Sequence, residues 1–208
     1  KLVTLQDGSI VHLNTDTALD LDFNEERRLV LLRRGEALFD VTHDSQRPFV
    51  VEAGSEWVQA LGTKFNVYKT DVGVTVAVLE GSVQVTQLAE SGVPERAPRR
   101  LKSGQRTSDR NPAVITDIGR PELRRISAWQ NGKLEFESEA LPDVLKEINR
   151  YTTTELVIAD DRLNDHRITG LFFVGDMNSV LFALEESFDV QATKSDNKII
   201  LSLAIRAK

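Results

Sequence analysis

The sequence contains no cysteine among its 208 residues. This absence excludes disulfide bonds, thiol nucleophiles and every metal site built on thiolates, and it leaves the redox compartment undetermined. Only 3 histidines are present, without HExxH or EF-hand spacing, so the sequence predicts no metal site. No cofactor is expected either, because no GxGxxG or Walker loop occurs.

Long apolar runs are also missing. None approaches the ~20 residues of a membrane-spanning helix, and no signal peptide is visible at the start of the chain. The sequence begins with Lys1 rather than Met and enters a strand pattern at once. We therefore expect an excised or processed part of a longer protein, with any targeting element upstream.

The sequence also lacks an excess of positive charge. The formal net charge is −6 at pH 7, and a negative protein repels phosphate backbones, so we expect no nucleic-acid partner. Arginine doublets such as Arg33-Arg34 are pairs rather than runs and are typical of solvated faces. Hydrophobic residues make up 40% and charged residues 28%, a balance that favours a folded globular chain over a disordered one.

Up to about residue 118, short stretches alternate between apolar and polar residues, as half-buried strands do. In TALDLDF, for example, Leu19, Leu21 and Phe23 fall on one face and two aspartates on the other. No stretch keeps helical spacing for the length of a typical helix. This part of the chain is therefore predicted to be mainly β.

The same part carries an internal repeat, in which an apolar residue precedes a glycine by three positions and a polar residue follows it. The repeat recurs at Gly8, Gly35, Gly81 and Gly104. Repeats of roughly 20 to 50 residues suggest stacked coils, so we favour a β-helix-like stack, with a jelly-roll sandwich as the alternative. Residues 88–112, rich in Ser, Gly, Pro and Arg, predict a long hairpin loop around one short strand.

After Arg120-Pro121 helical spacing appears. LPDVLKEINRY carries one apolar stripe, and a second helix is expected after Asp176, which suits its N-terminal cap. Together with strands at 133–137, 155–160 and 167–174, and in FDVQAT and KIILSL, the order is βαβ followed by βαββ. The stripe of the first helix comprises Leu141, Val144, Leu145 and Ile148.

This change of pattern predicts two domains and a bridge. A mainly β domain covers residues 1–118, a linker carrying Trp129 covers 119–131, and a small α+β domain covers 132–208.

His43 and Asp44 are the pair that most resembles an active site. Neighbours on a strand point to opposite faces, however, and THDSQRP has the composition of a turn. We therefore interpret the pair as a solvated turn and predict no catalytic residue. The densest group of acidic residues lies in a loop between two strands, where solvated carboxylates are usual: Asp160, Asp161 and Asp165, with His166.

Four consecutive apolar residues from 171 to 174 cannot all face one core. Either both faces of this strand are covered, or a face or an edge is left for a partner. The last strand, 198–203, is a second candidate edge for pairing with a partner strand. We predict a partner-binding surface formed by Leu171, Phe172, Phe173, Val174, Ile199 and Leu201.

The stretches LNTDTAL and ALGTKFNV lie in a succession that resembles the FecR family, named for regulators of iron-uptake signalling. The other members of the succession are RRLVLLRRGEALFDV, RPFVVEAG and VAVLEGSVQV. AWQNGKLEFESEALPDVLKEINRY and RITGLFFVGDMNSVLFALEESFDV are similar to the small secretin and TonB N-terminal domain with which many FecR-like regulators end.

The resemblance implies a periplasmic region of an inner-membrane sigma-factor regulator, an anti-sigma factor, tethered through an upstream helix absent from this chain. It implies as partner the N-terminal signalling domain of an outer-membrane TonB-dependent siderophore transporter. A site-specific periplasmic protease is expected to act on the full-length protein. Because the anti-sigma segment is also absent, this chain should not bind a sigma factor by itself.

Two other functions stay open. One is a periplasmic envelope or carbohydrate-binding module, although 2 Trp and 2 Tyr offer few rings for stacking on sugars. The other is a hydrolase that uses scattered carboxylates.

Overall fold

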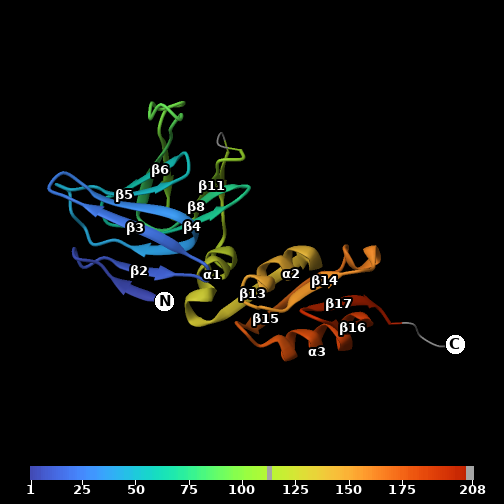
Figure 1. The fold of residues 1–208 in the computed structure, drawn as a ribbon. Helices are drawn as coiled ribbons and strands as arrows, with labels where there is room; N and C mark the ends of the chain where they lie inside the picture. Colours follow the sequence, from blue (N-terminus) through green and yellow to red (C-terminus); the bar gives the residue numbers. More distant parts are fainter. Residues whose placement is uncertain (112–113, 205–208) are drawn as a thin grey trace. The chain divides into compact units, whose positions relative to one another are not determined.

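The computed structural model describes residues 1–111 and 114–204. The chain divides into two compact units, Lys1–Ser127 and Ala128–Lys208 (Figure 1). The division falls inside residues 119–131, the segment for which the sequence predicts a linker.

That segment is helical. It holds α1 (Arg120–Ala128) and the short 3-10 helix η1 (Trp129–Asn131), neither of which the sequence predicted. Pro121 suggests a break in helical structure, but proline is tolerated in the first turn of a helix, where its missing N–H has no partner to lose. No residue of α1 is buried, so the helix lacks the broad apolar stripe by which the other helices were found.

The first unit is mainly β, as predicted. Its strands are β1 (Leu2–Thr4), β2 (Ile10–Leu13), β3 (Ala18–Phe23), β4 (Arg28–Asp40), β5 (Phe49–Ala53), β6 (Glu56–Ala60), β7 (Lys64–Thr70), β8 (Gly73–Glu80), β9 (Ser82–Gln87), β10 (Arg99–Lys102), β11 (Gln105–Ser108) and β12 (Ile115–Asp117).

The long strand β4 belongs to two sheets. Its residues 28–34 pair with β3 and β5, in a sheet ordered β3-β4-β5-β6-β9-β10. Its residues 35–40 pair with β2 and β7, in a sheet ordered β1-β2-β4-β7-β8-β11-β12. β4 therefore connects two layers whose inner faces supply one core.

The favoured β-helix-like stack is wrong, and the sandwich kept as its alternative describes this unit. Stacked coils pair successive turns in parallel, whereas β4 and β5 are the only parallel pair among the described strands of the unit. The repeated glycines have another cause. Gly8, Gly35, Gly81 and Gly104 all have φ between 79° and 84°, a region that glycine enters without steric cost.

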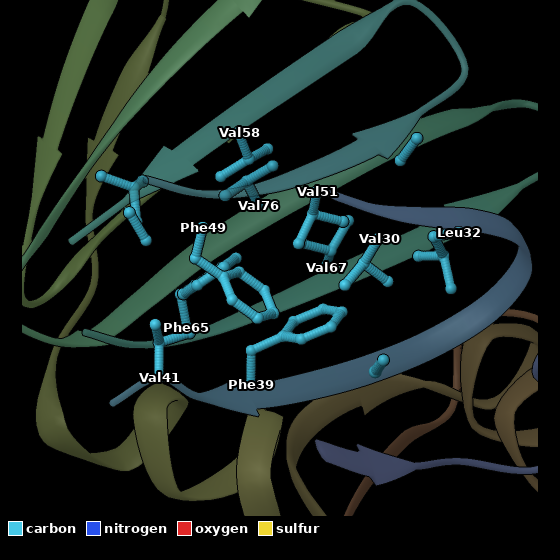
Figure 2. Packing of buried hydrophobic residues seen from close by; sticks show 14 of the residues in the cluster. Val30, Leu32, Phe39, Val41, Phe49, Val51, Val58, Phe65, Val67 and Val76 are labelled. Carbon is cyan, nitrogen blue, oxygen red and sulfur yellow. The ribbon is translucent and has the colours of Figure 1, made fainter. Parts of the chain in front are cut away.

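The core lies between the two sheets (Figure 2). Phe49 of one layer and Phe39 of the other have ring centroids 5.9 Å apart, and Phe39 lies 5.2 Å from Phe65. All three rings are fully buried. Valines from both layers, including Val58 and Val76, pack around them (Figure 2).

The LNTDTAL and ALGTKFNV stretches meet at one buried carboxylate. Glu36 accepts hydrogen bonds from the amide nitrogens of Asn14 at 2.7 Å and Asn66 at 3.0 Å. The backbone of Glu36 is held by Thr17, whose hydroxyl donates to the carbonyl oxygen at 2.9 Å and accepts from the N–H at 3.0 Å. These motif residues therefore fix the β4 segment at which the two sheets diverge.

Residues 88–112 differ from the prediction of one short strand in a loop. Two strands, β10 and β11, lie in this stretch and are joined through Ser103 and Gly104. Leu88 forms an isolated bridge with Pro94, which closes a short hairpin ahead of β10. Pro112 lies outside the described residues.

The second unit has the predicted order, βαβ followed by βαββ. Its elements are β13 (Lys133–Ala140), α2 (Leu141–Asn149), β14 (Glu155–Ile158), η2 (Asp161–Leu163), β15 (Arg167–Phe173), α3 (Met177–Phe188), β16 (Val190–Ser195) and β17 (Lys198–Leu203).

The α2 stripe is buried as predicted: Leu141, Val144, Leu145 and Ile148 all lie in the core of the second unit. Asp176 caps α3 by accepting a hydrogen bond from the backbone N–H of Ser179 at 3.1 Å. β13 pairs with β15 in a two-stranded sheet, and β14, β17 and β16 form a three-stranded one.

Candidate partner-binding surface

β15 resolves the run of four apolar residues by alternation. Leu171 is 52% and Phe173 56% exposed, whereas Ile168, on the opposite face of the strand, is 2% exposed. Successive side chains of a strand point to opposite faces, so two of the apolar residues face away from the core. One face of β15 therefore presents a pair of large apolar side chains to solvent.

The other two residues of the apolar run lie on the core side of this strand. Phe172 and Val174 are partly buried and pack against the core of the second unit. The ring centroid of Phe172 lies 6.0 Å from that of Phe136 on β13. These two side chains hold β15 in place rather than forming the exposed face.

The expectation that β17 is an open edge is wrong. β17 lies between β14 and β16 and pairs with both, so its backbone groups are already used. Ile199 is 8% and Leu201 0% exposed, both within the core. The sequence gives no sign of this, because β14, which pairs with β17 in parallel, precedes it by some forty residues.

The edge of β15 opposite β13 pairs with no strand among the described residues. An unpaired edge presents free N–H and C=O groups to which an extended segment can add. On the neighbouring strand β13, Lys133 lies opposite Phe173 and Glu135 lies opposite Leu171. Charged side chains thus border the apolar pair, an arrangement of apolar centre and polar rim that is common at protein interfaces.

A recess of about 60 Å³ lies beside Phe173, bounded by β13, β15, α2 and α3. Its lining includes Leu134, Tyr151 and Met177, of which the last two were not singled out from the sequence. Both continue a helical apolar stripe by three positions, Tyr151 beyond Ile148 and Met177 before Val180. Extending each stripe by one turn would have identified them.

Asp176 also lines the recess. Hydrogen bonds from the side chain and backbone of Ser179 lower the pKa of this carboxyl, so it is negatively charged at neutral pH. The recess therefore combines mainly apolar side chains with one negative charge in its lining.

The two groups of residues considered as candidate catalytic or metal-binding sites form local structural contacts. Asp44 accepts hydrogen bonds from the backbone of Gln46 and Arg47 and pairs with the Arg47 side chain at 3.1 Å, as a turn residue does. Asp160 pairs with Arg162 at 2.6 Å, and hydrogen bonds from this arginine lower the pKa of Asp160 to about 2. Within residues 1–111 and 114–204, no His and carboxylate side chains are grouped as metal ligands would be.

Comparison with known proteins places these observations in a family. Residues 1–84 match the FecR protein model, and residues 133–201 match the model of the FecR C-terminal region. Together these matches cover most of the chain and both units. The chain belongs to the FecR family. It is a FecR-like sigma-factor regulator, a class of regulatory proteins rather than of enzymes.

Two crystal structures of a candidate anti-sigma factor from Parabacteroides distasonis ATCC 8503 are similar to this FecR-like chain. The structure at 1.65 Å has a TM-score of 0.79 and 28% identity, covering 99% of this chain and 95% of the other. The structure at 2.50 Å has a TM-score of 0.77 and 28% identity, covering 99% and 94%. No match is found among curated proteins.

β15 lies inside the stretch that matches the FecR C-terminal model. None of the helices in the described part of the chain is both long and apolar enough to cross a membrane.

Proposed function

We propose that this chain is the periplasmic signalling region of an inner-membrane sigma-factor regulator. In this proposal it binds the N-terminal signalling domain of an outer-membrane TonB-dependent siderophore transporter and relays iron-uptake signals to transcription. An upstream helix tethers the full-length protein, and a site-specific periplasmic protease acts on it. Membership of the FecR family supports the regulatory role.

One observation carries the choice of surface. Leu171 and Phe173 are 52% and 56% exposed on a strand whose outer edge pairs with no other described strand. Large apolar side chains in contact with water are costly, and aromatic residues are enriched at the centres of protein interfaces. We assign the contact to β15, with Leu171 and Phe173 touching the partner.

The remaining predicted residues have indirect roles in this proposal. Phe172 and Val174 keep β15 in position, and Ile199 and Leu201 stabilise the core beneath it. The recess beside Phe173 receives an apolar side chain of the partner. The function proposed for this surface is recognition between two proteins.

The test is a calorimetric titration of the full chain with the isolated signalling domain of its cognate transporter. Phe173→Ala is expected to weaken binding roughly 30-fold or more, because loss of an aromatic hot spot costs ~2 kcal/mol or more. Phe182→Ala is the matched control, since Phe182 is 66% exposed but lies on α3. It should bind like the unmodified chain.

Two results would contradict the proposal in different ways. Wild-type affinity in both Leu171→Ala and Phe173→Ala would exclude β15 as the surface while leaving the partner standing. Absence of binding by the unmodified chain would exclude direct recognition of the transporter by this region.

A further inference from the structure

The first unit contains a second candidate site, a cavity of about 830 Å³. Pockets that hold small ligands have volumes of roughly 300 to 1,000 Å³, so this one is large enough for a bound molecule. It lies between strands β5, β6 and β9 and the hairpin of residues 88–98 that follows β9, green in Figure 1. The hairpin is fixed to the sheet by a hydrogen bond from the Leu88 N–H to the Ser55 carbonyl at 2.8 Å.

The floor of the cavity is the outer face of the sheet. Val51, Val58 and Val85 are fully buried in the core, so residues that alternate with them along the strands point the other way. Two rows of side chains result. Glu52, Trp57 and Thr86 are aligned across β5, β6 and β9, and Gln59 faces Gln84 in the neighbouring row.

Four polar side chains around the cavity have unused hydrogen-bonding capacity. They come from the two rows and from the hairpin: Glu52, Gln59, Gln84 and Glu90. None of the four side chains forms a hydrogen bond or ion pair with another residue in the described part of the chain. Glu56 also lines the cavity but differs from them, because its carboxylate already pairs with Arg99 at 3.0 Å.

The chemistry of these groups selects the kind of ligand. An amide side chain donates and accepts hydrogen bonds, as a hydroxyl group does, whereas an ammonium or guanidinium group offers only donors. Two facing amides, Gln59 and Gln84, therefore suit a molecule rich in hydroxyls. The carboxylates of Glu52 and Glu90 accept from hydroxyls and repel anionic groups.

Trp57 supplies the apolar part of the lining. The Arg27 guanidinium lies over its ring, 5.7 Å from the centroid, an attractive cation–π arrangement that holds the indole in place. This positive charge disfavours a second cation at the same ring. An indole presents both a flat apolar surface and a polar N–H, which suits the C–H face and the hydroxyls of a sugar ring.

We infer that this cavity binds a neutral saccharide, with Trp57 stacking on a sugar ring and Gln59, Gln84, Glu52 and Glu90 hydrogen-bonding its hydroxyls. The site is separate from β15, lies in the other unit, and does not depend on the function proposed for that strand. It would give the β sandwich a ligand of its own.

The test uses tryptophan fluorescence. The chain has 2 tryptophans, so Trp129→Phe leaves Trp57 as the only one and makes the emission report on the cavity. The full-length variant is titrated with maltotetraose, cellotetraose and chitotetraose, and with a Lys/Arg-rich decapeptide as the cationic alternative. Saturable change in Trp57 emission is expected with at least one of the three oligosaccharides and not with the peptide.

Variants then locate the binding. In the same background, Gln59→Ala and Gln84→Ala are each expected to weaken saccharide binding roughly fivefold to tenfold, the usual effect of losing one hydrogen bond. Gln46→Ala is the matched control, because Gln46 is an exposed glutamine of the same unit that does not line the cavity. It should leave affinity unchanged.

Each other outcome overturns the inference. No response to any of the three oligosaccharides at millimolar concentration would exclude them as ligands of the cavity. Saturation by the peptide alone would assign the cavity to basic protein segments. Saccharide binding unaffected by both Gln59→Ala and Gln84→Ala would place the saccharide elsewhere on the chain.

Discussion

Arg28 is the most unusual residue of the first unit, a guanidinium with a fully buried side chain. It pairs with Asp7 at 2.6 Å, donates from Nε to the Arg47 carbonyl at 2.9 Å, and donates from one terminal nitrogen to the Thr42 carbonyl at 2.9 Å. Phe49 lies beneath it, 5.4 Å from ring centroid to guanidinium carbon. One cation thus ties the β1–β2 turn, the start of β4 and the loop after β4 together.

Asp7→Asn tests this buried pair. Removing one partner of a buried ion pair leaves an uncompensated charge, so we expect a loss of about 2–4 kcal/mol in the free energy of unfolding at pH 7. Burial alone would raise the pKa of Asp7, but hydrogen bonds from Ser9 and Arg28 outweigh burial and lower it. Stability from a carboxyl with a lowered pKa is present above its unfolded-state pKa and is lost as pH falls through the folded-state value.

The difference in the free energy of unfolding between wild type and Asp7→Asn should therefore shrink as pH falls below 3.8, the ordinary pKa of this carboxyl group. Urea unfolding of both proteins at a series of pH values measures it. Asp22→Asn, at an exposed position on β3, is the control and should cost little at any pH. A difference that stays constant down to the lowest pH would contradict the role given to the ionised carboxylate.

At the scale of elements, strand β4 bends as it passes from one sheet to the other, and only a few residues make this bend possible. Its pairing with β3 shifts register between Ala18 and Leu19, a bulge that turns the strand from one sheet toward the other. Gly35 follows the bulge with φ at 84°, and a Cβ there would lie 2.5 Å from Thr17 Oγ1 and 2.6 Å from the Asp16 carbonyl oxygen. A side chain at this position meets backbone that cannot move freely.

Gly35→Ala is therefore expected to lower the free energy of unfolding by about 2–4 kcal/mol, combining an unfavourable φ with steric overlap. Gly92→Ala separates the two effects, since Gly92 has φ of 78° but nothing within 4 Å of its Cβ position. That control should lose only about 1 kcal/mol. Equal losses in the two variants, measured by urea unfolding, would show that crowding at Gly35 contributes nothing.

The local sequence pattern predicted individual helices and strands well, but it predicted poorly which strands pair with one another. The stripe ending at Ile148 and the cap at Asp176 identified both long helices of the second unit, because helical spacing and capping are encoded within a few residues. The position of Ile199 in a central strand was missed, since it depends on pairing with a distant β14. α1 was missed because its amphipathic face is short and none of its residues is buried.

The candidate surfaces follow the same division. The exposed pair on β15 could be anticipated, because four consecutive apolar residues on a strand violate alternation. The cavity around Trp57 could not be, because Glu52, Gln59 and Gln84 become neighbours only through the pairing of β5, β6 and β9. Individually these residues read as the ordinary polar face of separate strands.

The whole molecule has two cores rather than one. Phe39 and its neighbours form the core of the first unit, and Leu184 belongs to a separate cluster in the second. Each unit also carries one tryptophan, Trp57 in the first and Trp129 in the second. The chain therefore offers a separate fluorescent report on each unit.

Separate cores predict separate unfolding. Phe39→Ala should lower the stability of the first unit by about 3–5 kcal/mol and Leu184→Ala that of the second by about 2–5 kcal/mol, since both side chains are at most 1% exposed. Urea unfolding is followed in a Trp129→Phe background for the first unit and a Trp57→Phe background for the second. Each core variant should shift the transition of its own unit and leave the other within about 0.5 kcal/mol. A shift of both transitions by either variant would mean that the two units fold as one cooperative structure, and the β sandwich and the β15 surface could then not be altered independently.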